Sequence, residues 1–355
     1  PICVMQGFLW LLPGISWNSH YSQGGLAMVS LKKYLDPLPI PPILKPKYRN
    51  EKETFYVVRM MQAYQTLHSE LPATRIWGYE GMYPGPVICA RKKEKVLIRW
   101  ENHLPEKHFL PVDKTLHGTM DGPEVRTVVH LHGAKVRPES DGYPEAWFTN
   151  NYEQTGSYFS RRVYWYPNCQ QAATLWYHDH ALGITRLNVY AGLAGFYLLR
   201  DSLERKLNLP KGSYEIPLLI QDRSFNPDGS LFYPSQPEPP VPGVAPSITP
   251  GFAGDVILVN GKVWPFLAVE PRKYRFRILN GSNQRFYRVR FDPELPIYQI
   301  GTDGGFLSAP VKLEELLLAP AERADVIVDF SDCKGKHLIL RNDAPVPFPT
   351  GTPAD

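Results

Sequence analysis

Two stretches of this sequence decide the fold: Thr-Val-Val-His-Leu-His-Gly at residues 127–133 and Leu-Trp-Tyr-His-Asp-His at residues 175–180. β-Branched and aromatic residues surround the histidines of both stretches, which predicts two β-strands. Because residues i and i+2 of a strand point to the same face, the two histidines of each stretch project together. Two such strands side by side would present four imidazoles to one metal site.

Four of the ten histidines are therefore candidate metal ligands, namely His130, His132, His178 and His180. A single His-x-His pair is as often a hydrogen-bonded strand pair as a ligand pair, and its repetition in a second strand favours a metal. Neutral imidazole is the commonest metal ligand, and it suits zinc, copper, iron and nickel. Asp179 lies between the second pair and is expected to point away from the metal.

Two other metal-site architectures fit the sequence less well. A cupin-type site would need a glutamate four or five residues after the second histidine, where this sequence has Val136 and Arg137. A hydrolase on an α/β barrel would need strands that alternate with long amphipathic helices, whereas this chain is rich in proline and short strands. Both architectures remain minor alternatives.

The composition indicates a globular, β-rich chain. A length of 355 residues suggests two or three domains, and 43% hydrophobic residues can fill their cores. The 36 prolines, 27 glycines and 12% aromatic residues, with little helical periodicity, indicate β-sandwiches joined by long loops. A net charge of +4 spread along the chain predicts neither a nucleic-acid partner nor a membrane partner. No apolar stretch reaches the roughly 20 residues that span a bilayer.

Segments of alternating hydrophobicity predict strands in two sets. The first set lies at residues 54–61, 74–79, 95–102, 127–132, 160–166, 173–180 and 195–200. The second set lies at residues 214–222, 255–260, 274–280, 287–291, 298–302, 313–318, 324–330 and 336–341. Each set matches one Greek-key sandwich, so we expect an all-β protein with two similar domains in tandem, at residues 51–205 and 206–355.

The remaining segments have separate interpretations. Residues 1–27 are expected to be a non-native or upstream leader, because their apolar run lacks the basic start of a signal peptide. Residues 28–50 are a proline-rich N-terminal arm. Seven prolines between residues 233 and 250 indicate a long loop. The chain stops at Asp355 in a turn-rich segment, where a final strand or a third domain is expected.

The second predicted domain shows no obvious chemistry and is expected to be architectural. Asn260-Gly261 and Asp303-Gly304-Gly305 predict hairpin turns. Four arginines in its strands are interpreted as solvated or salt-bridged rather than catalytic: Arg272, Arg275, Arg277 and Arg323.

Six ordered motifs carry a resemblance to a known family. They are His-Leu-His-Gly at 130–133, Ser-Asp-Gly-Tyr-Pro-Glu-Ala-Trp-Phe at 140–148, Leu-Trp-Tyr-His-Asp-His at 175–180, Arg-Leu-Asn-Val-Tyr-Ala-Gly-Leu at 186–193, Ile-Leu-Val-Asn-Gly-Lys-Val-Trp-Pro at 257–265 and Leu-Ala-Pro-Ala-Glu-Arg-Ala-Asp at 318–325. From about Leu35 to its end the sequence resembles the multicopper oxidases, most closely the bacterial spore-coat laccases.

The resemblance implies three cupredoxin-like domains, of which this chain would carry the first two. It also implies one-electron oxidation of phenols or aromatic amines, coupled to four-electron reduction of O2 to water at copper ions. By resemblance His130 would bind the type 2 copper, His132 and His178 one type 3 copper, and His180 the other. Asp141 would match an acidic residue that helps deliver protons to the cluster, and the alternative is an ordinary turn aspartate.

Other copper ligands of the family do not occur in the sequence. It contains neither a His-Pro-x-His-x-His segment nor the His-Cys-His segment that would supply the type 1, or blue, copper site. Six further histidines are interpreted as ordinary surface or loop residues: His20, His68, His103, His108, His117 and His337. We therefore expect a laccase whose third domain is missing from this chain, with little or no oxidase activity from the chain alone.

Two alternatives stay open beside the laccase hypothesis. One is a non-catalytic copper-binding or coat-structural protein without the type 1 site, and the other is an unrelated four-histidine zinc or iron enzyme. The resemblance implies O2, a phenolic or aromatic-amine substrate and the missing third domain as partners, and a monomer when the protein is full length. It also implies a spore-coat or cytoplasmic location, in the absence of a convincing signal peptide.

Overall fold

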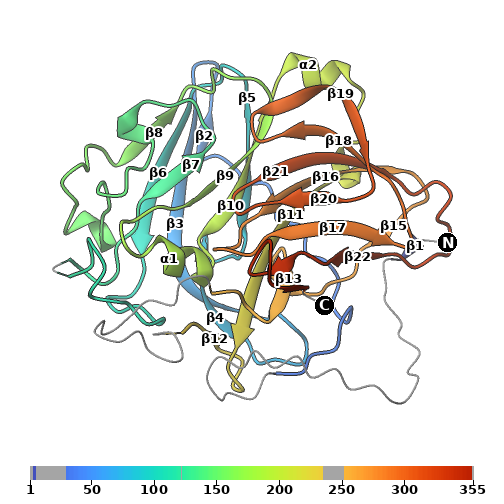
Figure 1. Cartoon of the computed structure of the whole chain (residues 1–355). Coiled ribbons are helices and arrows are strands. Elements are labelled where there is room, and N and C mark those ends of the chain that lie inside the picture. Colours follow the sequence, from blue (N-terminus) through green and yellow to red (C-terminus); the bar gives the residue numbers. More distant parts are fainter. Residues whose placement is uncertain (1–2, 5–28, 121, 235–251, 354–355) are drawn as a thin grey trace.

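The computed structural model describes residues 3–4, 29–120, 122–234 and 252–353, which form a nearly all-β protein (Figure 1). The expected leader at residues 1–27 lies almost entirely outside the described residues. Most of the predicted loop between residues 233 and 250 also lies outside them. No helix within the described ranges is long and apolar enough to cross a membrane.

The first half of the chain forms a sandwich of two sheets. One sheet has the strand order β2–β3–β6–β8, with β4 paired to β3: β2 Tyr48–Arg49, β3 Thr54–Gln65, β6 Val96–His103, β8 Val163–Tyr166 and β4 Thr74–Tyr79. The other has the order β5–β10–β9–β7: β5 Gly85–Arg91, β10 Ala194–Arg200, β9 Ala173–Asp179 and β7 Val129–His132. Both predicted His-x-His stretches therefore lie in one sheet, on neighbouring strands.

The second half forms a larger sandwich, on the right in Figure 1. Its main sheet runs β14–β13–β11–β16–β21–β18–β19, with β12 on β11: β14 Lys262–Val263, β13 Val256–Val259, β11 Glu215–Phe225, β16 Lys273–Asn280, β21 Arg323–Asp329, β18 Ile297–Thr302, β19 Gly305–Leu313 and β12 Leu231–Phe232. The facing sheet runs β20–β17–β22: β20 Leu316–Leu318, β17 Tyr287–Asp292 and β22 Ile339–Asn342.

Short elements complete the described structure. Two small two-stranded sheets pair β1 Cys3–Val4 with β15 Ala268–Val269, and β23 Pro345–Val346 with β24 Thr352–Pro353. The helices are short: η1 Pro138–Ser140, η2 Asn150–Tyr152, α1 Thr185–Ala191, α2 Ser202–Lys206 and η3 Gly212–Tyr214. Both α-helices flank strands of the histidine sheet, since α1 follows β9 and α2 follows β10.

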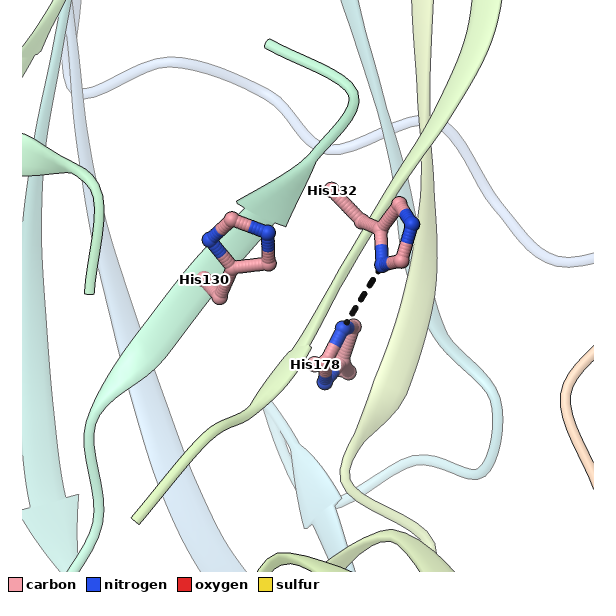
Figure 2. A group of neighbouring side chains, drawn as sticks. All are labelled: His130, His132 and His178. Atoms are coloured by element: carbon pink, nitrogen blue, oxygen red, sulfur yellow. Dashed lines mark hydrogen bonds between the residues drawn. The ribbon is translucent and has the colours of Figure 1, made fainter. Parts of the chain in front are cut away.

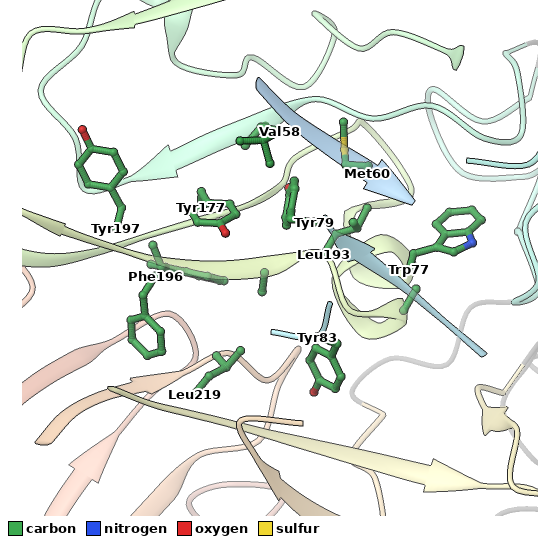
Figure 3. Close-up of a cluster of buried hydrophobic side chains, with 14 of the residues drawn as sticks. Val58, Met60, Trp77, Tyr79, Tyr83, Tyr177, Leu193, Phe196, Tyr197 and Leu219 are labelled. Atoms are coloured by element: carbon green, nitrogen blue, oxygen red, sulfur yellow. The ribbon is translucent and has the colours of Figure 1, made fainter. Parts of the chain in front are cut away.

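The central strands β11 and β16 of the main sheet of the second sandwich are buried on both faces. Leu218 and Ile220 of β11 point into the core of their own sandwich. Leu219 points the opposite way and joins the first core, together with Phe196 of β10 (Figure 3). Because successive strand residues alternate, β11 contributes to two hydrophobic cores at once. Phe196 pairs with Trp176 of β9, so the two sandwiches share an apolar contact on the same face of the first sandwich's sheet as the histidines.

A buried ion-pair network lies beside this contact. Arg277 of β16 is 1% exposed and donates hydrogen bonds to Glu204 of α2 at 2.5 Å and to Glu215 of β11 at 2.6 Å. Arg275 donates to Glu204 at 2.7 Å and to Asp325 at 2.5 Å. These two arginines were expected to be solvated or salt-bridged, and they are not solvated because the face of β16 that carries them is covered by the first sandwich. The salt-bridged alternative is confirmed.

The N-terminal arm crosses both sandwiches. Leu44 donates its N–H to the carbonyl of Val87 on β5. Leu38 donates its N–H to the carbonyl of Phe266, in the second sandwich. Asp36 accepts a hydrogen bond from the backbone N–H of Ser69 at 2.8 Å. The arm is thus held at several points along its length by hydrogen bonds of its backbone and of the Asp36 side chain.

Most of the predicted strands are present within a few residues of their expected ends. The Asn260-Gly261 turn is confirmed, because Val259 pairs with Lys262 and both turn residues have positive φ, 50° and 76°. β5 and most of β19 were not predicted. β5 is buried almost throughout, and a strand covered on both faces lacks the alternation that reveals a half-exposed one.

Candidate metal centre

Strands β7 and β9 pair antiparallel and bring the two His-x-His stretches together. In their register His130 lies opposite His178, and His132 lies opposite Trp176. Directly opposite residues of such a pair share one face, about 5 Å apart at Cβ. All four predicted ligands therefore project from the same face of two neighbouring strands.

The four imidazole rings form a compact cluster. The centroid of the His130 ring lies 4.9 Å from that of His180 and 5.5 Å from that of His178. His132 and His178 are also 5.5 Å apart. A ring nitrogen from each of His130, His132 and His178 falls within 4.8 Å of the others, and Figure 2 draws these three rings together. Such spacing suits ligands that share one ion or neighbouring ions.

Backbone carbonyls orient three of the rings. Nδ1 of His130 lies 2.5 Å from the carbonyl oxygen of Asp141, and Nδ1 of His178 lies 2.7 Å from that of Asp179. Nδ1 of His180 lies 2.9 Å from the carbonyl oxygen of Gly142. A carbonyl can only accept, so each Nδ1 carries the proton. Nε2 of each ring is then left with a lone pair for a metal, an arrangement common among metal-binding histidines.

His132 differs from the other three histidines, because its Nδ1 rather than its Nε2 faces the cluster. Its Nδ1 lies 3.3 Å from Nε2 of His178, and the two rings meet edge to edge in Figure 2. Two nitrogens bound at about 2.0 Å to one tetrahedral ion would be about 3.3 Å apart. The pair therefore has the separation expected of two ligands to the same ion. The same separation also allows a hydrogen bond between the rings while no ion is present.

Burial keeps the imidazoles of His132, His178 and His180 neutral. Desolvation lowers the pKa of His178 well below its usual value, with His130 adding to the effect. Desolvation and the nearby guanidinium of Arg323 lower the pKa of His132 to about 4. Desolvation and His130 also lower the pKa of His180. Since a metal binds only unprotonated imidazole, the site is ready for a metal at neutral pH.

The loop after η1 contacts two of the clustered histidines, His130 and His180. Gly142 has φ of 76°, and a Cβ at this position would collide with the carbonyl oxygen of Val129. The glycine lets the loop lie directly on β7 and bring its own carbonyl to His180. The Asp141 carboxylate lies 3.4 Å from Nδ1 of His130 and is 38% exposed, so it contacts both the cluster and solvent.

Two further residues of the site were not identified from the sequence as site residues. Trp176 shares the histidine face and lies 4.1 Å from His178 and 5.4 Å from His132 between ring centroids. Its period-two spacing from His178 was a usable signal. Arg323 of β21 is buried and donates from Nε to the carbonyl of Thr174 on β9. No local sequence signal could place Arg323, because it comes from the other sandwich.

The remaining histidines lie outside the cluster. His103, His117 and His337 are exposed, as expected. His68 and His108 lie in loops, which agrees with the expectation, but both side chains are buried rather than at the surface. Each is held by hydrogen bonds: Nε2 of His68 to the carbonyl of Lys32, and Nε2 of His108 to the side chain of Asn188. His20 lies outside the described residues.

Comparisons with known proteins agree on one family. Two family models, both described as multicopper oxidase, match residues 61–204 and 242–354. A laccase from Bacillus stratosphericus is 55% identical over 322 residues, which cover 89% of this chain and 63% of the relative. A laccase from Bacillus subtilis (strain 168) is 54% identical, with 89% and 62% covered.

The solved structures give the same result. The structure of a laccase from Pediococcus acidilactici superimposes with a TM-score of 0.72 at 30% identity, covering 91% of this chain and 62% of that one. The fold is therefore the tandem cupredoxin-like sandwich. The chain belongs to the multicopper oxidase family, and copper is the metal that this family implies. It spans less than two thirds of the length of these relatives.

Proposed function

We propose that this chain supplies part of the O2-reducing copper centre of a laccase-like multicopper oxidase. The oxidase would remove single electrons from phenols or aromatic amines and reduce O2 to water. The observation that supports this function best is the convergence of four imidazoles on one face of β7 and β9. The laccase relatives supply the reaction class.

The geometry suits a division of the histidines among three copper positions. His132 and His178 would hold one type 3 ion, because their facing nitrogens are 3.3 Å apart. His130 would hold the type 2 ion and His180 the other type 3 ion, with their rings stacked at 4.9 Å. Imidazole supports both oxidation states of copper and also binds zinc and iron. The choice of copper therefore rests on the family, not on the donor set alone.

Bound copper would supply the electron transfer. The chain's residues would orient the imidazoles, exclude water and pass protons. The carbonyls of Asp141, Asp179 and Gly142 hold each Nδ1 proton, so that Nε2 stays available. Trp176 and the surrounding sheet exclude water from one side of the cluster. Asp141 is the group that would pass protons, because its Oδ1 lies beside His130 while its carboxylate remains open to solvent.

We further propose that the 355-residue chain binds copper without oxidising phenols. The sequence contains no His-Cys-His segment, and a blue-copper centre needs a cysteine thiolate beside two histidines. Electrons would then have no entry port in this chain. The third domain as a partner, the monomeric state and the spore-coat or cytoplasmic location stay predictions that belong to this proposal.

The test is a copper titration of the purified chain and of two variants. We expect His178→Ala to lose bound copper and His103→Ala, a change at an exposed histidine outside the cluster, to keep it. Copper per chain, Cu(II) electron paramagnetic resonance and O2 uptake with a phenol would be measured together. Equal copper binding by both variants would refute the proposed copper centre. Rapid phenol oxidation by the chain alone would refute the proposal that this chain cannot take electrons from a phenol.

A further inference from the structure

Asp179 lies between two of the candidate ligands but on the opposite face of β9, where it is fully buried. Its Oδ1 accepts the backbone N–H of Val128 at 3.2 Å, just before β7 begins. Its Oδ2 accepts the backbone N–H of Ala181 at 3.0 Å, just after β9 ends. One carboxylate therefore joins the start of one histidine strand to the end of the other.

This junction determines where His180 leaves the sheet. The N–H of His180 donates to the carbonyl of Val128 at 2.8 Å, so Val128 is bonded through both of its backbone groups. On the other side, Nδ1 of His180 donates to the carbonyl of Gly142. The backbone N–H of His180 is thus held by Val128, which Asp179 positions in turn. The imidazole of His180 is held by Gly142, in the loop after η1.

A buried relay orients the carboxylate. Nδ1 of His108 accepts the N–H of Leu110 at 2.9 Å, so its proton sits on Nε2 and is donated to Oδ1 of Asn188 at 3.1 Å. The amide nitrogen of Asn188 then faces its acceptors, the carbonyl of Arg126 at 3.1 Å and the Asp179 carboxylate. His108, Asn188 and Asp179 are all buried, so water cannot replace these bonds freely.

We propose that Asp179 is a positioning residue of the metal centre, oriented by Asn188 and His108, and that it holds the two histidine strands in binding register. It touches no metal itself. The inference rests on the proposed copper centre and extends it to residues behind the sheet. Outer partners of this kind typically change metal affinity 10- to 100-fold when they are mutated.

The central variant is Asp179→Asn, which keeps the shape of the side chain. An amide offers one acceptor oxygen and places a donor nitrogen against a backbone N–H, so one of the two junction bonds is lost. The control is Asp222→Asn in the second sandwich, where a buried carboxylate accepts the backbone N–H of Gly254 at 2.5 Å. Both variants lose a buried acceptor, but only the first lies behind the histidines.

Cu(II) alone serves as the probe, added to the full 355-residue chain in competition with a chelating dye. We expect Asp179→Asn to weaken Cu(II) binding about 10- to 100-fold and to change the copper hyperfine splitting, and Asp222→Asn to do neither. Unchanged affinity and spectrum in a folded Asp179→Asn chain would overturn the inference. If that variant does not fold, Asn188→Ala decides by the same two readouts.

The wild-type chain and His178→Ala separate this inference from the function on which it rests. Copper binding that His178→Ala does not affect would remove the proposed centre, and the positioning role with it. Copper binding that depends on His178 but not on Asp179 would leave the centre standing and refute only the positioning role.

Discussion

Arg277 of β16 donates a hydrogen bond from Nη2 to Oε1 of Glu204 in α2 over 2.5 Å, inside the contact between the two sandwiches. Its Nη1 also donates to Thr174 on β9, the strand that carries His178 and ends just before His180. Burial alone would raise the pKa of the Glu215 carboxyl, but the guanidiniums of Arg277 and Arg200 lower it to about 2. The network thus stays ionised and fixes the second sandwich against the histidine sheet.

Replacing Arg277 by methionine should destabilise the protein strongly. The change leaves buried carboxylates without a partner, which typically costs about 3–5 kcal/mol. The measurement is the free energy of unfolding in urea. Arg290→Met is the control, because Arg290 pairs with Asp343 at a position 40% exposed, and such pairs contribute about 1 kcal/mol or less. Equal losses of unfolding free energy in the two variants would contradict the claim that burial makes the Arg277 ion pairs more costly to break.

The candidate ligands could be read from the sequence, but their register could not. Alternation along a strand is local, so the shared face of His178 and His180 follows from their spacing alone. The pairing of His130 with His178 joins strands that are far apart in the chain, and no local pattern states which strands are neighbours. The sequence could therefore predict a metal site only on the condition that β7 and β9 lie side by side.

The arginines show a different limit of sequence reasoning. Period-two alternation puts Arg275 and Arg277 on one face of a strand, but it leaves open whether that face is solvated or salt-bridged. Here that face is buried against the first sandwich, and the carboxylates that neutralise it come from α2, β11 and β21. Their positions depend on the tertiary packing of the two sandwiches, which alternation does not encode.

Gly142→Ala should displace the loop that supports His180 and so lower both the stability of the protein and its affinity for Cu(II). The φ of 76° at Gly142 is unfavourable for alanine, and the added Cβ would collide with the carbonyl of Val129. Gly335→Ala is a matched control, because Gly335 has φ of 75° but open space around the added carbon. We expect the control to lose about 1 kcal/mol of unfolding free energy and Gly142→Ala to lose more, together with weaker Cu(II) binding. Identical behaviour in both assays would refute the close approach.

His108 should make the stability depend on pH. Desolvation, opposed by the hydrogen bond to Asn188 and aided by Arg186, lowers the pKa of His108 to about 4. An unfolded histidine titrates near pH 6.5, so between pH 6.5 and 4 the unfolded chain binds the extra proton and the folded protein loses stability as the pH falls. Relative to His108→Gln, the wild type should lose up to about 3 kcal/mol over this range. Parallel stability curves for the two proteins would contradict the lowered pKa.

Copper should stabilise the folded chain through the four histidines. A ligand that binds only the folded state adds about 2.7 kcal/mol at a free concentration 100 times its dissociation constant. We therefore expect Cu(II) to raise the melting temperature of the wild type and of His103→Ala, and His132→Ala to lose most of this rise. We choose His132 for this variant, because its Nδ1 lies 3.3 Å from Nε2 of His178, as expected of two ligands to the same ion. A rise that survives in His132→Ala would mean that copper binds elsewhere on the chain.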